Sequence, residues 1–312
     1  MKVLFIGGSS FSGFWLCRFL SEVGHEVVMP LTRGVGEYEG LRRERLDALS
    51  DLGRLVPSAS LGSEGFLLLV QAEPWDVFCH HGAKVGNHKS PDFDVAQALE
   101  NNTRGLGEVL AAFGEGGCRK VVLSGTTFEA GEGAGEEPLR AFSPYGSSKG
   151  LTAEVFQNFC REQGMSLGKF VIPNPFGPWE DKGIAKYLIE TWLRGEVAEV
   201  RAPDYVRDTI PVDLLARCYG KFVEDLPETP GHFEKMNPSG YVETVGAFAQ
   251  RMARELGPRL GVQAELTFCE QTEFTEPRER SNTQPATELV PDWDESAFWD
   301  GYAEYSLERW GR

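Results

Sequence analysis

The 312-residue chain is poor in cysteine and lacks any long apolar run. Its six cysteines are scattered, with no Cys-X-X-Cys pair, so neither a zinc site nor a disulfide framework is predicted. No stretch of about 18 apolar residues occurs, and the apolar start at Val3–Ile6 reaches glycine too soon for a signal peptide. We therefore expect a cytoplasmic protein with reduced thiols, no membrane partner and no bound metal.

Positive charge is scarce as well. The formal net charge is −16 at pH 7 and the pI is near 4.9. This balance argues against nucleic acid or an anionic membrane surface as the main partner. A hydrophobic content of 41% in a chain of this length supports one large domain or two closely joined domains.

The N-terminal residues have the pattern of a βαβ unit with glycines in its first turn. Val3–Ile6 is a short apolar run typical of a buried parallel strand, and Gly7–Gly13 follows it directly. An apolar helical face then runs over 14–20 and ends at Gly24, before a second strand over 26–31. Such a turn presents the N-terminus of a helix to a dinucleotide diphosphate. The alternative is a tight structural turn without a ligand.

Tyr145 and Lys149 form the second informative pattern. They lie four residues apart at the start of a helix predicted over 150–162, so they share one face if the helix has already begun. At about 6 Å and an effective dielectric of about 20, a lysine ammonium favours the phenolate by about 3 kcal/mol, or about two pKa units. Tyr145 would then serve as an acid or base near neutral pH. The alternative is a solvated surface pair.

Together these motifs resemble the extended short-chain dehydrogenases/reductases of the NAD(P)-dependent epimerase/dehydratase group. The family loop Gly-X-X-Gly-X-X-Gly corresponds to Gly7, Ser10 and Gly13, with Ser10 departing from the pattern. The resemblance runs from residue 1 to about 300. It implies an α/β Rossmann fold, a doubly wound parallel sheet with a smaller C-terminal substrate-binding domain. The dinucleotide-binding domain would span 1–173 with a return segment at about 206–225, and the substrate-binding domain would span 174–205 and 226–312.

The residues after the second strand favour NADP over NAD. An acid at this point would bind the ribose hydroxyls of NAD, whereas an arginine accommodates the 2′-phosphate of NADP. The chain has Arg33 here and no acid, and Arg42 and Arg43 are weaker candidates for the same phosphate. Either cofactor, NADP or NAD, is compatible with the rest of the sequence.

The family also places cofactor contacts at the ends of later strands. A third strand predicted near 56–61 ends in Ser60 and Leu61 where the family has an acid and an apolar residue, and Asp47 is the second choice. His80–Ala83 resembles the family motif after the fourth strand. Adjacent histidines on a strand point to opposite faces, which argues against a shared metal ion. The cofactor-binding residues implied by the resemblance are Gly7, Ser10, Phe11, Ser12, Gly13, Arg33, Ser60, Leu61, His80, Gly82, Ala83, Asn102, Tyr145, Lys149 and Pro173.

Asn102 is expected to open the helix after the fourth strand. Beyond the fifth strand, 119–123, the family carries a hydroxyl on a loop that binds the reacting sugar oxygen, and Thr126 matches this position, with Ser124 as second choice. Dehydratases carry two acids next, but Thr127 and Phe128 stand there instead. A 4,6-dehydration would therefore lack its proton shuttle.

Three residues of the C-terminal half resemble the family's nucleotide-sugar contacts. Asn174 and Arg207 match motifs that contact the diphosphate, and Arg278, or less well Arg280, matches a second arginine. Asp208 is expected to fix local structure instead. A C-terminal group of aromatic residues is expected to pack on the substrate-binding domain: Trp293, Trp299, Tyr302, Tyr305 and Trp310.

The implied function is hydride transfer between a nicotinamide and carbon 4 of a nucleotide-linked sugar. Tyr145 would be the general acid/base, Lys149 would lower its pKa and hold the nicotinamide ribose, and Thr126 would bind the reacting oxygen. A 4-epimerase and a 4-ketoreductase share this apparatus. The alternatives are a flavonol- or steroid-type reductase and a non-catalytic dinucleotide-binding module. The resemblance further implies a homodimer.

Overall fold

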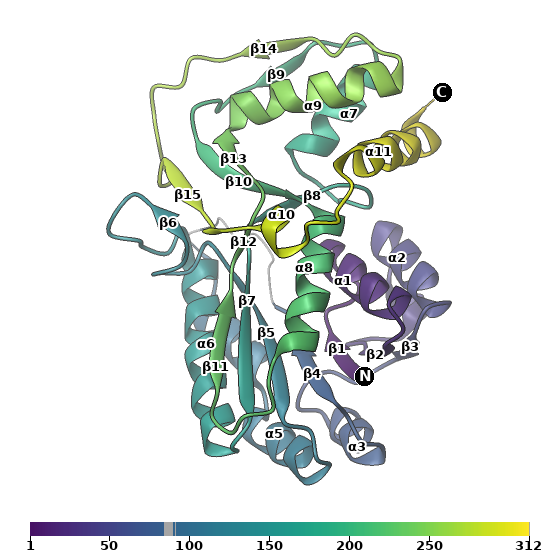
Figure 1. The fold of residues 1–312 in the computed structure, drawn as a ribbon, viewed down its shortest axis with the longest axis vertical. Helices are drawn as coiled ribbons and strands as arrows, with labels where there is room; N and C mark the ends of the chain where they lie inside the picture. Colours follow the sequence, from purple (N-terminus) through teal and green to yellow (C-terminus); the bar gives the residue numbers. More distant parts are fainter. Residues whose placement is uncertain (84–89, 91, 312) are drawn as a thin grey trace. The chain divides into compact units, whose positions relative to one another are not determined.

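The computed structural model describes residues 1–83, 90 and 92–311, and it divides into two compact units (Figure 1). Unit 1 contains Met1–Glu132, Arg140–Ile172 and Ala216–Asn237. Unit 2 contains Gly133–Leu139, Pro173–Leu215 and Pro238–Arg312. The segment that returns to the first unit thus differs from the expected 206–225.

Unit 1 is built on a parallel sheet that has seven strands in the described residues. The strand order is β11-β7-β5-β4-β1-β2-β3, so the order reverses at β1. This doubly wound arrangement confirms the predicted Rossmann fold, in which ligands bind at the carboxyl ends of the strands near the reversal. The strands are β1 (Lys2–Ile6), β2 (Glu26–Pro30), β3 (Arg54–Val56), β4 (Val77–His80), β5 (Lys120–Thr126), β7 (Ser166–Ile172) and β11 (Phe233–Met236).

Two strand predictions need correction. The third strand does not occupy 56–61 but ends at Val56, because Pro57 cannot donate to a ladder and Ser58 adopts a φ of +55°. The fifth strand is longer than predicted, because β7 pairs with it as far as Thr126. The candidate hydroxyls at 124 and 126 therefore lie on a strand end and not on a loop.

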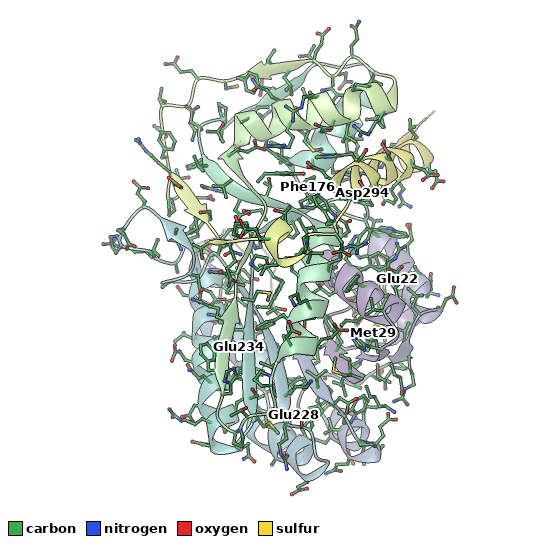
Figure 2. The ribbon with its side chains drawn as sticks, viewed as in Figure 1. Glu22, Met29, Phe176, Glu228, Glu234 and Asp294 are labelled. Atoms are coloured by element: carbon green, nitrogen blue, oxygen red, sulfur yellow. The ribbon has the colours of Figure 1, made fainter. Side chains whose placement is uncertain are left out.

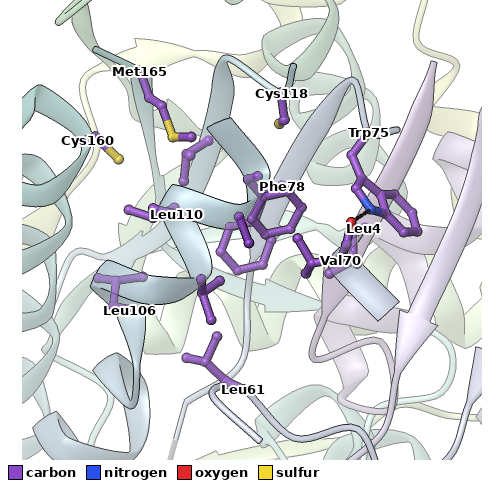
Figure 3. Packing of buried hydrophobic residues seen from close by; sticks show 14 of the residues in the cluster. Leu4, Leu61, Val70, Trp75, Phe78, Leu106, Leu110, Cys118, Cys160 and Met165 are labelled. Atoms are coloured by element: carbon purple, nitrogen blue, oxygen red, sulfur yellow. Dashed lines mark hydrogen bonds between the residues drawn. The ribbon is translucent and has the colours of Figure 1, made fainter. Parts of the chain in front are cut away.

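Helices cover both faces of this sheet (Figure 1). Side chains from alternate strand positions enter the two layers: Leu4 joins a core with α3, α5 and α6, whereas Phe5 packs on Tyr219 of α8. Figure 3 shows the first core around Phe78 and Leu110, with the Trp75 indole donating to the Val70 carbonyl. The helices are α1 (Phe11–Glu22), α2 (Gly40–Ser50), α3 (Glu64–Ala72), α4 (Val95–Thr103), α5 (Leu106–Glu115), α6 (Pro144–Glu162) and α8 (Val212–Asp225, of which 216–225 belong to unit 1). A 3₁₀ turn, η1 (Val35–Glu37), precedes α2.

Helix α6 begins before the predicted residue 150. The Ser143 hydroxyl accepts a hydrogen bond from the Gly146 amide, and Pro144 occupies the first turn, where its missing N–H is not needed. Tyr145 and Lys149 therefore lie within one regular helix, one turn apart.

Unit 2 combines short strands with helices around an aromatic core. Phe176, labelled in Figure 2, packs against Phe248, Phe298 and Trp299, and Asp294 caps the last helix. The C-terminal aromatics all join this core, as predicted. The strands are β6 (Ala134–Gly135), β8 (Asn174–Phe176), β9 (Ala198–Val200), β10 (Val206–Pro211), β12 (Pro238–Ser239), β13 (Tyr241–Thr244), β14 (Leu266–Phe268), β15 (Glu279–Ser281) and β16 (Gln284–Pro285), and the helices are α7 (Ile184–Leu193), α9 (Val245–Leu260), α10 (Ala286–Leu289) and α11 (Glu295–Trp310).

Among the described residues, no helix has both the length and the apolar character needed to cross a bilayer.

The core of unit 1 predicts a clear stability difference between two substitutions. Phe78 is inaccessible to solvent and stacks on Phe113 with ring centroids 4.8 Å apart, whereas Leu68 is 60% exposed. We expect Phe78→Ala to lower the free energy of unfolding by about 3–5 kcal/mol and Leu68→Ala to change it by less than about 0.5 kcal/mol. Urea denaturation followed by circular dichroism measures both. Equal losses would contradict the assigned core.

Candidate active site

The glycine-rich loop joins β1 to α1 and is closed by close backbone packing. A Cβ on Gly13 would lie 2.2 Å from the Gly7 carbonyl oxygen, and one on Gly7 would lie 2.8 Å from the Gly82 nitrogen. Gly7 also has a φ of +101°, which disfavours other residues. The loop therefore requires glycine at both of its ends.

Ser10 replaces the family's middle glycine and caps α1. Its hydroxyl accepts from the Gly13 amide at 3.1 Å and donates to the Gly7 carbonyl at 2.9 Å. The amides of Phe11 and Ser12 follow in the first turn, where a helix provides no acceptor of its own. An anion bound here would therefore meet these amides and the positive end of the helix dipole.

Arg45 supports this loop and was not predicted. It is fully buried on α2, and its Nε donates to the Ser9 carbonyl at 3.0 Å. The segment 37–56 is mostly charged, and nothing in the sequence distinguishes Arg45 from the exposed charged residues around it.

His81 connects the loop to the neighbouring strand ends. Its Nε2 lies 3.0 Å from the Ser12 hydroxyl, and its Nδ1 lies 2.8 Å from the Ser124 hydroxyl. His80 points to the other face of the sheet, edge-on to Phe156, which confirms that the two histidines do not face each other. Burial, and then the charge of Lys149, lowers the pKa of each histidine to about 3. Both imidazoles are thus neutral at pH 7.

Other predicted cofactor contacts lie near this edge of unit 1. Leu61 is buried in the core, and Ser60 begins the turn after β3 by accepting from the Ser63 amide. Ala83 follows Gly82, where a Cβ would approach Ile6 to 2.8 Å.

Asn102 does not open a helix as predicted. It lies near the end of α4, which begins earlier because Asp94 caps it, and its buried amide donates to Thr152 of α6 at 3.2 Å. Within the described residues its role is to hold α4 against α6. No cluster of residues in the described part of the chain could hold a metal ion.

Arg33 is exposed just beyond β2. Its guanidinium lies 4.6 Å from the ring centre of Tyr38, a cation–π contact. Arg43 and Asp47 instead pair with each other at 2.7 Å on the surface of α2. Of the candidate residues in this region, Arg33 alone stands directly after the strand.

A buried carboxylate, Glu129, connects the catalytic candidates. It accepts from the Thr126 amide at 2.8 Å, and it interacts electrostatically with both Tyr145 and Lys149. The Thr126 hydroxyl accepts from the Phe128 amide at 3.3 Å, so its proton can point elsewhere. The Glu129 carboxylate thus binds the Thr126 backbone and interacts electrostatically with the other two predicted catalytic residues. The sequence does not distinguish Glu129 from the other acids of the same segment, Glu132, Glu136 and Glu137.

The predicted direction of the Tyr145 pKa is wrong for this structure. Burial, and then the charge of Glu129, raises the pKa of the phenol well above its ordinary value. Burial also lowers the pKa of Lys149 to about 8, opposed by Glu129 and assisted by Lys169. Desolvation, which the spacing argument omitted, therefore outweighs the attraction between the two side chains. Tyr145 is a neutral proton donor at pH 7.

The predicted diphosphate contacts and Pro173 belong to unit 2. Asn174 donates to the Asp208 carbonyl at 2.9 Å, and Arg207 binds the Glu276 carboxylate at 3.1 Å. Arg207 also donates to the carbonyls of residues 277 and 278 and therefore braces that loop. Arg278 is exposed and stacks on Phe274 at 4.2 Å.

Two neighbours of these residues have other surroundings. Arg280, the second choice after Arg278, is buried. Asp208 accepts from the amides of Gly240 and Asn282 at 2.8 Å each, which gives it the structural role expected from the sequence.

A Rossmann sheet, a glycine-rich loop at a helix N-terminus and a tyrosine–lysine pair on α6 define a member of the extended short-chain dehydrogenases/reductases. The family model for the NAD dependent epimerase/dehydratase family matches residues 3–234, and the chain belongs to this family. It is therefore an enzyme of a family that depends on a nicotinamide dinucleotide. A comparison with curated proteins finds no match.

Solved structures of 4-epimerases share the fold. UDP-glucose 4-epimerase from Thermotoga maritima, solved with UDP-glucose, is 20% identical with a TM-score of 0.75 over 99% of both chains. UDP-glucuronic acid 4-epimerase from Bacillus cereus, solved with UDP-glucuronic acid and NAD, is 19% identical with a TM-score of 0.69 over 99% of this chain and 100% of that one. UDP-glucose 4-epimerase from Thermus thermophilus, solved with NAD, is 19% identical with a TM-score of 0.70 over 98% of this chain and 99% of that one.

His80, which is buried, and His81, which is half-buried, predict a loss of stability in mild acid. Their pKa values are near 3 in the folded protein against an ordinary value of 6.5, so the unfolded chain binds protons first. Stability is therefore complete above pH 6.5 and falls as the pH drops toward 3, by up to about 1.4 kcal/mol per pH unit for each histidine. We expect His81→Gln, which can still bond both serines, to remove about half of this slope between pH 6.5 and 5. An unchanged slope in urea denaturation would contradict the neutral state of His81.

Proposed function

We propose that the chain is an NAD(P)-dependent enzyme that acts on a nucleotide-linked sugar by hydride transfer at carbon 4, as a 4-epimerase or a 4-ketoreductase. The observation that carries this proposal is that Glu129 binds the Thr126 backbone and interacts electrostatically with Tyr145 and Lys149, which lie one turn apart on α6. Membership of the epimerase/dehydratase family supports it, as do the UDP-sugar complexes of proteins with the same fold.

The residues of unit 1 fit a dinucleotide. The loop from Gly7 to Gly13 would hold the diphosphate, since its close packing leaves the first amides of α1 available to an anion. Ser60, Leu61 and Ala83 would line the adenosine and nicotinamide sides, and Lys149 would bind the nicotinamide ribose. When bound, the oxidised nicotinamide supplies a hydride acceptor and a positive charge that favours the phenolate of Tyr145.

In the proposed reaction Tyr145 exchanges a proton with the sugar hydroxyl at carbon 4. The Thr126 hydroxyl donates a hydrogen bond to the same oxygen, keeps its proton and stabilises the charge that develops there. Thr126 is preferred to Ser124 because the Ser124 hydroxyl is already bonded to His81. Lys149, mostly protonated at pH 7 with its pKa near 8, adds positive charge near the phenol.

Two observations favour a ketoreductase over an epimerase. The raised pKa keeps Tyr145 protonated and ready to donate a proton during reduction, and Arg33 suits the 2′-phosphate of NADP. The epimerase is favoured by the solved structures with the same fold. We propose both as outcomes of the same apparatus.

A reductase of a hydrophobic alcohol is the second candidate. The Arg207 guanidinium is occupied by Glu276 and two backbone carbonyls, and the Asn174 amide by the Asp208 carbonyl. Both side chains thus already have hydrogen-bond partners within the protein. Arg278, which is exposed, remains the proposed diphosphate contact that favours a nucleotide-linked substrate.

Replacement of Tyr145 tests the mechanism. We expect Tyr145→Phe to reduce turnover of the nucleotide-linked sugar by about 100-fold or more, because it removes the proton-transfer group. Tyr187→Phe, which alters an exposed tyrosine of unit 2, should leave turnover unchanged. Product formation is followed by chromatography of the nucleotide sugars. Full activity of Tyr145→Phe would refute the assigned role.

Replacement of Arg33 tests the cofactor preference. Arg33→Ser should weaken NADPH binding roughly tenfold or more, since it removes a charge-assisted hydrogen bond, and should leave NADH binding nearly unchanged. Arg43→Ser is the matched control, because Arg43 is paired with Asp47. Isothermal titration calorimetry measures all four affinities. A selective loss in Arg43→Ser instead would move the phosphate site to α2.

A further inference from the structure

Unit 1 contains a chain of buried ion pairs beside the proposed catalytic residues. The Lys169 ammonium on β7 lies 2.6 Å from Glu129 and 2.7 Å from Glu132, and Glu132 also binds Lys235 of β11 at 2.9 Å. Glu129 has no solvent-accessible surface, and Lys169 and Glu132 are buried. Burial of charge is costly and is tolerated only with close partners. A buried ion-pair cluster at the end of a core strand therefore indicates a role other than packing.

Glu129 fixes the backbone that carries Thr126. One carboxylate oxygen accepts from the Thr126 amide at 2.8 Å, and the other accepts from Lys169. Gly125, which precedes Thr126, packs against the Glu129–Lys169 ion pair: a Cβ there would lie 2.8 Å from the Lys169 Cε and 3.0 Å from the Glu129 carboxylate. The end of β5 is therefore held by the ion pair.

The same turn is packed against the start of α6. The Phe128 carbonyl accepts from the Phe142 amide at 3.0 Å, and a Cβ on Gly146 would lie 2.1 Å from that carbonyl oxygen. Gly146 follows Tyr145 directly. The position of the proposed acid/base thus depends on the turn that Glu129 closes.

We propose that Glu129 is a positioning residue of the active site: its carboxylate holds the Thr126 backbone and provides the buried negative charge shared by Tyr145 and Lys149. The inference rests on the proposed function in one respect, namely that these three residues are the reacting groups. Lys169 holds the Glu129 carboxylate in place, and Glu132 completes the pairing of Lys169.

The charges around Lys149 determine the direction of the effect. Glu129 raises the pKa of Lys149 and opposes its burial, while Lys169 lowers it; on the β4 side, Lys149 faces the neutral His80 and His81. Glu129 raises the pKa of Tyr145 as well. Loss of the carboxylate charge therefore lowers both pKa values, and Lys149 loses its proton nearer to pH 7.

The test is a titration of Lys149 in the protein without added ligand, by NMR of lysine labelled with ¹³C at Cε. Lys149→Arg identifies the resonance by its disappearance. Glu129→Gln keeps an oxygen that can accept from Thr126 but removes the charge. We expect it to lower the pKa of Lys149 from about 8 by on the order of one pH unit.

Glu132→Gln is the matched control, because it removes one charge from the same cluster and leaves Glu129 bonded to Thr126. We expect a shift of less than half that of Glu129→Gln. An unchanged pKa in Glu129→Gln, or an equal shift in Glu132→Gln, would overturn the inference.

If Glu129→Gln leaves Lys169 unpaired and does not fold, the double variant Glu129→Gln with Lys169→Met removes both charges. The Lys149 pKa should still fall, because Glu129 has the larger effect of the two. An unchanged or raised pKa in the double variant would overturn the inference.

The titration uses no substrate and therefore separates the two proposals. A lowered Lys149 pKa together with a wild-type protein that turns over no nucleotide-linked sugar would refute the proposed function and keep the electrostatic role of Glu129. If the wild type turns over a nucleotide-linked sugar but the Lys149 pKa does not shift in Glu129→Gln, the proposed function stands and the role of Glu129 is refuted. If both proposals are correct, the fall of kcat/KM at high pH begins at a lower pH in Glu129→Gln than in the wild type.

Discussion

The close approach of β1, β4 and β5 at their carboxyl ends is the constraint on which the active site depends. A Cβ on Gly7 would lie 2.8 Å from the Gly82 nitrogen, and a Cβ on Gly82 would lie 2.8 Å from the Ile6 side chain. Because the sheet is parallel and reverses its order at β1, these ends all open on one edge. Polar groups placed there are partly removed from water and must find partners within the protein. The chain satisfies them with two networks, one through His81 and one through Glu129.

The two networks connect different parts of the site. His81 is neutral and joins the first turn of α1 to Ser124, so it connects the loop proposed for the diphosphate with the strand next to the reacting groups. Glu129 is charged and joins Thr126 to the charges of α6 and β7. A neutral His81 suits the loop, because the charge of Lys149 disfavours a cation at His81. A charged bridge suits α6, because Lys149 would otherwise lose its proton more readily.

Much of the fold could be predicted from local patterns. The strand, glycine loop and helix at the N-terminus are contiguous in the sequence. Tyr145 and Lys149 are four residues apart, so the sequence alone places them on one face of a helix. The missed features involve contacts between distant segments. Glu129 and Lys169 are 40 residues apart, and their pairing depends on the register of β5 with β7. The shift of the Tyr145 pKa was predicted in the wrong direction, because the spacing of two residues along a helix does not show how deeply they are buried.

Direct detection of hydride transfer tests the central claim most directly. The purified protein would be incubated with NAD or NADP and a panel of nucleotide-linked sugars deuterated at carbon 4, then denatured, and its dinucleotide analysed by mass spectrometry. The account predicts one of two results for at least one sugar: a dinucleotide that has gained deuterium by net oxidation of the sugar, or a recovered 4-epimer that still carries the deuterium at carbon 4. A protein that binds the dinucleotide but gives neither result with any of the sugars, while it reduces or oxidises a hydrophobic alcohol, would contradict it.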